Sequence, residues 1–164
     1  MTTKLKIVFP IILIIALILG VAPASYAAAE KQANIKVEPD CKVLFFDNEM
    51  ELTLPVLNVN DRLLYPFREI LEEMGAKVEW DEATSTAKGT VYGRDFARTV
   101  EFTIDSETYK SNGYEINMDP GVTAILYNDR TYIPIRYAAE CLGYQVLWFD
   151  ETKTVSIGYF GEGV

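Results

Sequence analysis

The chain has 164 residues, of which 49% are hydrophobic and 24% charged, so it can bury a core without metals or many disulfides. Its 24 acidic residues outnumber 15 basic ones, and the net charge of -9 argues against binding to nucleic acids or anionic membrane surfaces. The chain has no histidine, which removes the commonest general base and nearly all biological copper sites. We therefore expect a protein that is not an enzyme and holds no cofactor.

The first segment has the order of a secretory signal peptide. Lys4 and Lys6 precede an apolar run over residues 7–21, and small residues follow over 22–29. The run is shorter than the roughly 20 residues that a spanning helix needs, which disfavours a permanent anchor. Residues 1–27 are predicted as a signal peptide, cleaved after Ala27 or Ala29. The mature chain is then secreted, extracytoplasmic and associated with the cell surface, without a stable membrane span.

Two short segments come next. Residues 28–40 show no hydrophobic periodicity and are predicted as a flexible lead-in. Residues 43–46 and 50–54 flank the polar residues 47–49, a pattern typical of a hairpin.

The rest of the chain contains a diverged tandem repeat. Residues 60–80 align with residues 128–148 at a constant offset of 68, and nine of the 21 paired positions are identical. The two repeat units cover about residues 41–89 and 109–158. In the first unit the identical positions are Asn60, Asp61, Arg62, Pro66, Arg68, Glu72, Gly75, Val78 and Trp80.

Each unit predicts the same order of elements. The Asn-Asp pairs at 60–61 and 128–129 suit a tight hairpin turn because both residue types tolerate positive φ. Pro66 and Pro134 then open a helix that carries one apolar stripe, and Gly75 and Gly143 stand where a left-handed residue ends it. A strand of alternating hydrophobicity follows over 76–80 in the first unit, and a return strand follows over 85–92. The return strand of the second unit covers 154–160.

Residues between the two units predict further antiparallel strands. Residues 91–92 and 99–104 flank Gly93-Arg94-Asp95, with Val100, Phe102 and Ile104 facing inward, and Asn112-Gly113 marks another tight turn. The expected fold class is α+β, with mostly antiparallel strands packed on two short helices.

The repeated motif resembles a known family. Asn-Asp-Arg-x-x-x-Pro-x-Arg, an apolar helix, a glycine, and Val-x-Trp with a following Asp-Glu are similar to the copper amine oxidase N-terminal domain-like modules, the stalk domains of secreted bacterial proteins. The resemblance covers residues 41–160. Its signature positions are Arg62, Pro66, Arg68, Gly75, Trp80, Arg130, Pro134, Arg136, Gly143 and Trp148.

The resemblance implies a non-catalytic module of the cell envelope with an undefined ligand. By this resemblance, the module is an N-terminal appendage in the oxidases, and the copper ligands and the tyrosine-derived quinone belong to a separate catalytic domain. No cofactor is therefore expected here, and the expected partner is an envelope polymer or protein, with no nucleic acid.

The paired tryptophans and arginines are the first candidates for a site. Trp80 and Trp148 are either buried framework residues, which we favour, or a platform for stacking sugars. Arg68 and Arg136 either bond internally, to a carboxylate such as Asp81 or Asp150 or to backbone carbonyls, which we favour, or bind a carboxylate ligand. Arg62 and Arg130, which follow the turns, are expected to be structural.

Cys41 and Cys141 either form a disulfide or remain two separate thiols, since spacing alone does not decide between them. The ten tyrosines fit ordinary sheet composition but also suit glycan or protein contacts.

Three functions remain open from the sequence. The first is a secreted, non-catalytic cell-envelope interaction or structural module. The alternatives are a small carboxylate-dependent hydrolase, which a cleft with a buried carboxylate pair would favour, and a protein-binding inhibitor or assembly factor, which a flat aromatic patch would favour.

Overall fold

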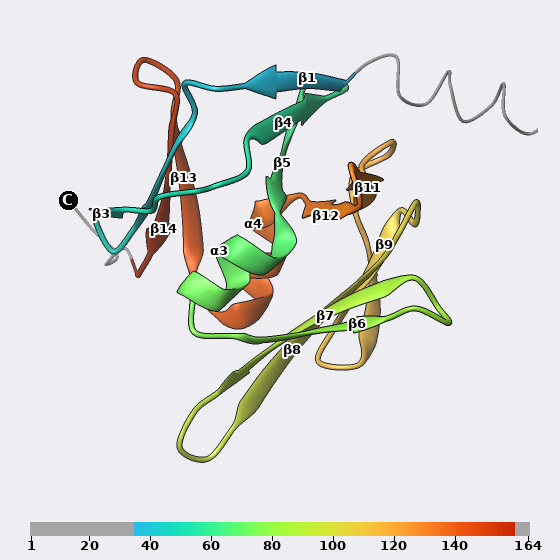
Figure 1. Cartoon of the computed structure of the whole chain (residues 1–164). Helices are drawn as coiled ribbons and strands as arrows, with labels where there is room; N and C mark the ends of the chain where they lie inside the picture. The colour runs from blue at the N-terminus through green and yellow to red at the C-terminus, as the bar shows by residue number, and fades with distance from the viewer. Residues whose placement is uncertain (1–34, 160–164) are drawn as a thin grey trace, which may run out of the picture. The chain divides into compact units, whose positions relative to one another are not determined.

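The computed structural model describes residues 35–159, which contain fourteen strands and two helices (Figure 1). The predicted signal peptide and residues 28–34 of the predicted lead-in lie outside this range. The end of the lead-in is not a flexible segment, because Ile35–Glu38 forms strand β1. No helix within residues 35–159 is long and apolar enough to cross a membrane.

The described strands form three sheets. The first has the order β1, β4 (Val56–Val59), β5 (Arg62–Pro66), β12 (Arg130–Ile133) and β11 (Ile125–Tyr127). The second has the order β10 (Tyr114–Asn117), β9 (Thr108–Ser111), β8 (Ala97–Thr103), β7 (Thr86–Tyr92) and β6 (Lys77–Asp81). The third has the order β13 (Gln145–Phe149), β14 (Thr154–Gly158), β2 (Lys42–Phe45) and β3 (Asn48–Glu49). With mostly antiparallel pairing and two short helices, the α+β prediction is confirmed.

The two repeated segments form the same elements in the same order. The first gives hairpin β4–β5, helix α3 (Phe67–Glu73) and hairpin β6–β7, and the second gives β11–β12, α4 (Ile135–Leu142) and β13–β14. The turns have the predicted positive φ, at +52° and +61° for Asn60-Asp61 and +48° and +57° for Asn128-Asp129.

The two segments meet along strands β5 and β12, which pair antiparallel. Tyr65 lies opposite Ile133, the residue that occupies the same place in the second segment, 68 positions later. This is the pairing expected across a local two-fold axis. Each helix also crosses over: α3 contacts β12, and α4 contacts β5.

The symmetry ends at the outer hairpins. Strand β7 continues antiparallel into β8, whereas β14 pairs parallel with β2. The opening hairpin is also shorter than the prediction. Its turn lies at Phe46-Asp47, both with positive φ, and β3 contains only Asn48 and Glu49.

The helix ends follow the sequence signals. Pro66 and Pro134 are extended N-cap residues, and Gly75 and Gly143 have φ of +77° and +97°. At Gly143 a side chain would collide with the guanidinium of Arg98, whose Nη1 donates to the last-turn carbonyl of Leu142 at 3.0 Å.

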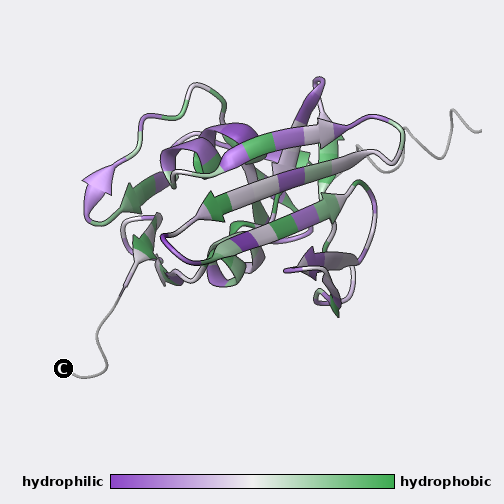
Figure 2. Ribbon diagram, turned by 90° about the horizontal axis from the view of Figure 1, so that it is seen from below, coloured by the Kyte–Doolittle hydropathy of each residue, from purple (hydrophilic) through white to green (hydrophobic). Residues whose placement is uncertain are grey.

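The apolar stripes of both helices are buried against the sheets. In the five-stranded sheet β6–β10, one row across the strands is Trp80, Ala87, Phe102, Tyr109 and Ile116. The neighbouring row alternates in charge: Glu79, Lys88, Glu101, Lys110 and Glu115. The predicted alternation is thus realised, as the hydrophilic and hydrophobic bands along the strands in Figure 2 show.

Candidate functional site

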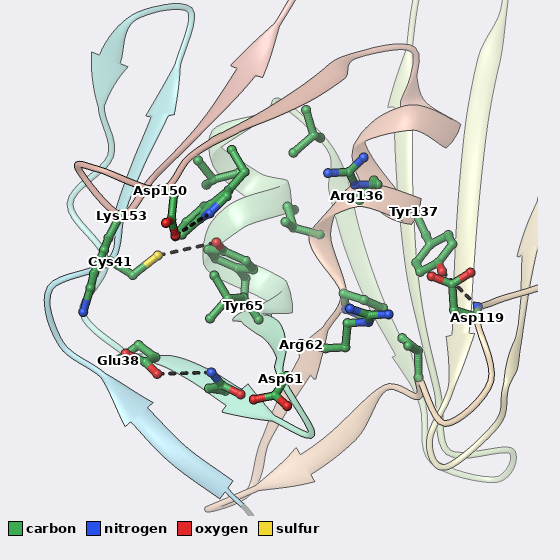
Figure 3. A pocket seen from close by; sticks show the side chains of 18 residues that line it. Glu38, Cys41, Asp61, Arg62, Tyr65, Asp119, Arg136, Tyr137, Asp150 and Lys153 are labelled. Carbon is green, nitrogen blue, oxygen red and sulfur yellow. Dashed lines mark hydrogen bonds between the residues drawn. The ribbon is translucent and has the colours of Figure 1, made fainter.

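A pocket of about 610 Å³ lies among the first-repeat hairpin, the start of α4 and the sheet β13-β14-β2-β3 (Figure 3). This volume falls within the range of small-molecule sites, about 300–1,000 Å³. Its lining combines three cationic, four acidic and three aromatic side chains with smaller residues: Arg62, Arg136, Lys153; Glu38, Asp61, Asp119, Asp150; Tyr65, Tyr137, Trp148; Cys41, Asn58, Leu63, Val122, Pro134, Ile135, Val146 and Val155.

The pocket draws on both repeats, and on different parts of each. The hairpin tip of the first repeat supplies Asp61 and Arg62, while the helix start and the first strand after it in the second repeat supply Arg136 and Trp148. The repeat-equivalent residues Arg130, Arg68 and Trp80 do not line it. The two copies of the signature therefore occupy different environments.

The prediction that both tryptophans are buried is wrong. Trp80 is 42% exposed and Trp148 is 40% exposed. Both lie in strands at the edge of a sheet, β6 and β13, where a side chain has a neighbouring strand on one side only. The indole Nε1–H of Trp148 donates to Asp150 Oδ1 at 3.4 Å, which orients the ring at the pocket.

The expected internal pairing with a carboxylate holds for Arg68, although its partner is Glu72 and not Asp81, and it does not hold for Arg136. Arg68 pairs with Glu72 at 3.0 Å along its own helix, and both side chains are more than half exposed. The Arg136 side chain is exposed and has no ion pair or hydrogen bond within residues 35–159. The same holds for Arg62 in that range. Two guanidinium groups of the pocket are thus free to bind an external group.

The acidic side chains of the pocket are not a buried pair. Glu38 accepts a hydrogen bond from Asn58 Nδ2 at 3.2 Å, Asp150 holds Trp148, and Asp61 and Asp119 are exposed. The backbone N–H of Asp119 donates to the hydroxyl of Tyr137 at 3.0 Å, which leaves that hydroxyl's own proton available. The pocket therefore lacks the buried carboxylate pair that would favour the hydrolase alternative.

Tyr65 and Cys41 form the inner part of the pocket, with Tyr65 buried and its hydroxyl 3.5 Å from Cys41 Sγ. Burial, more than the neighbouring Cys41, raises the pKa of Tyr65 far above its ordinary value. Burial also raises the pKa of the Cys41 thiol, against the opposing effect of its hydrogen bond with Tyr65. Both groups are therefore neutral at physiological pH, and Cys41 is a poor nucleophile.

The two cysteines do not form a disulfide. Cys41 contacts Tyr65, whereas Cys141 lies in the last turn of α4 and contacts Thr99 and Ser111 at 3.1 and 3.0 Å. The two thiols face different elements, so the alternative of two separate thiols describes this chain.

These residues do not fit a copper ion. Copper sites use imidazole and thiolate donors, but the chain has no histidine, and burial raises the pKa of both cysteine thiols. Within residues 35–159 no three Cys, Asp or Glu side chains gather as metal ligands.

Sequence reasoning identified Arg62, Arg136 and Trp148 but not their shared pocket. It did not single out Glu38, Lys153 or Tyr65, which no motif marks. The pairing of β1 with β4, of β5 with β12 and of β2 with β14 brings these distant segments together.

Comparison with known proteins gives one family. A family model described as the copper amine oxidase N-terminal domain matches residues 45–157, which is more than half of the chain. No curated protein and no solved structure matches the chain.

Proposed function

Because the chain belongs to the copper amine oxidase N-terminal domain family, we propose that it is a secreted, non-catalytic module that binds a component of the cell envelope through the pocket. The domain that gives the family its name is non-catalytic in the oxidases, which is compatible with a structural or binding role. The basic, apolar and small-residue order of residues 1–29 supports export.

The repeat supports a related proposal about how the pocket arose. A duplicated hairpin-helix-hairpin unit, joined through β5 and β12, would give two equivalent surfaces. Divergence of the second copy would then let its surface bind a ligand. In agreement with this, the helix start and the tryptophan of the second copy line the pocket, and those of the first copy do not.

The observation that carries the proposal is the set of exposed, unsatisfied side chains in the pocket. An aromatic ring held at the rim, two guanidinium groups without partners in residues 35–159 and several carboxylates converge on one concavity. A concave site with a few convergent polar groups is the usual form of a ligand site.

Sedimentation with isolated envelope tests this proposal. The purified chain should pellet with envelope from the organism that encodes it, and the pocket variant Trp148→Ala/Arg136→Gln should lose most of that retention. The matched control is Trp80→Ala/Arg68→Gln, which changes the equivalent residues of the first repeat and should sediment like the unaltered chain. Equal retention of both variants, or no retention of the unaltered chain, would contradict the proposal.

A further inference from the structure

We infer that the pocket binds a saccharide that carries carboxylate groups, of the uronic-acid type. This inference rests on the proposed function only in taking the pocket as the ligand site. Three features of the lining lead to it: an oriented indole, two free guanidinium groups and a set of hydrogen-bond acceptors.

The indole of Trp148 provides a face for a sugar ring. It is 40% exposed, and its Nε1–H donates to Asp150 Oδ1 at 3.4 Å. Val146 and Val155, both buried, support it from the same sheet. An aromatic ring that is apolar on its face and anchored at its N–H packs well against the C–H face of a pyranose.

The two guanidinium groups select an anion of planar shape. Arg62 comes from the hairpin tip of the first repeat and Arg136 from the first turn of α4, and Figure 3 shows both side chains among those that line the pocket. Arginine binds carboxylates with two parallel hydrogen bonds. A neutral sugar would leave both arginines without a charged partner.

The acidic side chains favour a ligand that also carries hydroxyl groups. Glu38, Asp61, Asp119 and Asp150 line the pocket together with the three cationic groups, so oxygen acceptors lie in the same concavity as the guanidinium groups. Carboxylates are acceptors only and bind hydroxyl groups readily. A molecule that bears many hydroxyls and a few carboxylates satisfies both sets of side chains.

Calorimetric titration with trigalacturonic acid tests the inference. The unaltered chain should bind this trisaccharide, and galactotriose and the trigalacturonate methyl ester should bind about tenfold or more weakly, because each lacks the charged partner of the arginines. Arg136→Gln and Arg62→Gln should each weaken trigalacturonate binding about tenfold or more, and Trp148→Ala should do so for all three sugars.

The first repeat again supplies the controls. Arg68→Gln, Arg130→Gln and Trp80→Ala should leave the affinity unchanged, since these residues lie outside the pocket. Citrate, which offers carboxylates without a sugar ring, should not compete. Equal binding of galactotriose, competition by citrate, equal losses in the control variants or no binding of trigalacturonic acid would each overturn the inference. Envelope sedimentation that fails while trigalacturonate binds would overturn the proposed function but not the ligand class.

Discussion

Phe102→Ala should lower the free energy of unfolding by about 3–5 kcal/mol, the usual cost of removing a large buried aromatic side chain. Phe102 has no exposed surface and lies in the middle strand of the sheet β6–β10. Its ring stacks on that of Tyr109, with centroids 5.6 Å apart. Removing it leaves a cavity where the sheet covers the helices. Urea denaturation followed by circular dichroism measures the change.

Trp80→Ala is the matched control for this substitution. Trp80 lies in the same row across the sheet but in its edge strand, where it is 42% exposed. Its removal should cost less than about 1 kcal/mol, because an exposed side chain leaves little cavity. Similar losses for the two variants would show that Trp80 is a core residue.

High pH should destabilise the protein through Tyr65. Burial raises the pKa of Tyr65 in the folded chain far above its ordinary value of 10.0, so the unfolded chain loses this proton first. The stabilising contribution is complete below about pH 10 and is lost as pH rises toward the folded pKa. The free energy of unfolding should fall by about 1.4 kcal/mol for each pH unit above 10 for this one group.

Comparison of Tyr65→Phe with the unaltered chain at pH 9 to 11.5 isolates this effect. In the variant, the free energy of unfolding should fall less steeply with pH, by the contribution of one proton. Tyr114→Phe, at a side chain that is 77% exposed, should keep the slope of the unaltered chain. Tyr132, also buried and with a raised pKa, accounts for part of what remains. An unchanged slope in Tyr65→Phe would contradict the assignment.

Local signals in the sequence predicted the local structure. Asn-Asp pairs form turns, Pro66 and Pro134 precede the helices, and Gly75 and Gly143 end them with positive φ. Each of these depends on the conformational preference of one or two residues, which the sequence states directly. The opening hairpin turns one residue earlier than predicted because Phe46, a residue type that rarely adopts positive φ, occupies its turn.

The environment of each side chain was harder to predict. Trp80 and Trp148 occur in strands with the right alternation, but their exposure depends on β6 and β13 being edge strands, which only the sheet order decides. Arg68 and Arg136 are each followed four residues later by a glutamate, Glu72 and Glu140, yet only Arg68 forms the ion pair within residues 35–159. The pocket itself combines residues separated by up to 117 positions, from Glu38 to Val155.

The spectrum of the indole N–H groups tests the central claim most directly. The chain has two tryptophans, so a ¹⁵N-labelled sample gives two indole signals, which Trp80→Phe assigns. Addition of trigalacturonic acid should shift the Trp148 signal, whose N–H is bonded to Asp150 at the pocket, and should leave the Trp80 signal in place. Equal shifts of both signals, or no shift of the Trp148 signal at saturating ligand, would contradict the claim that this pocket is the binding site.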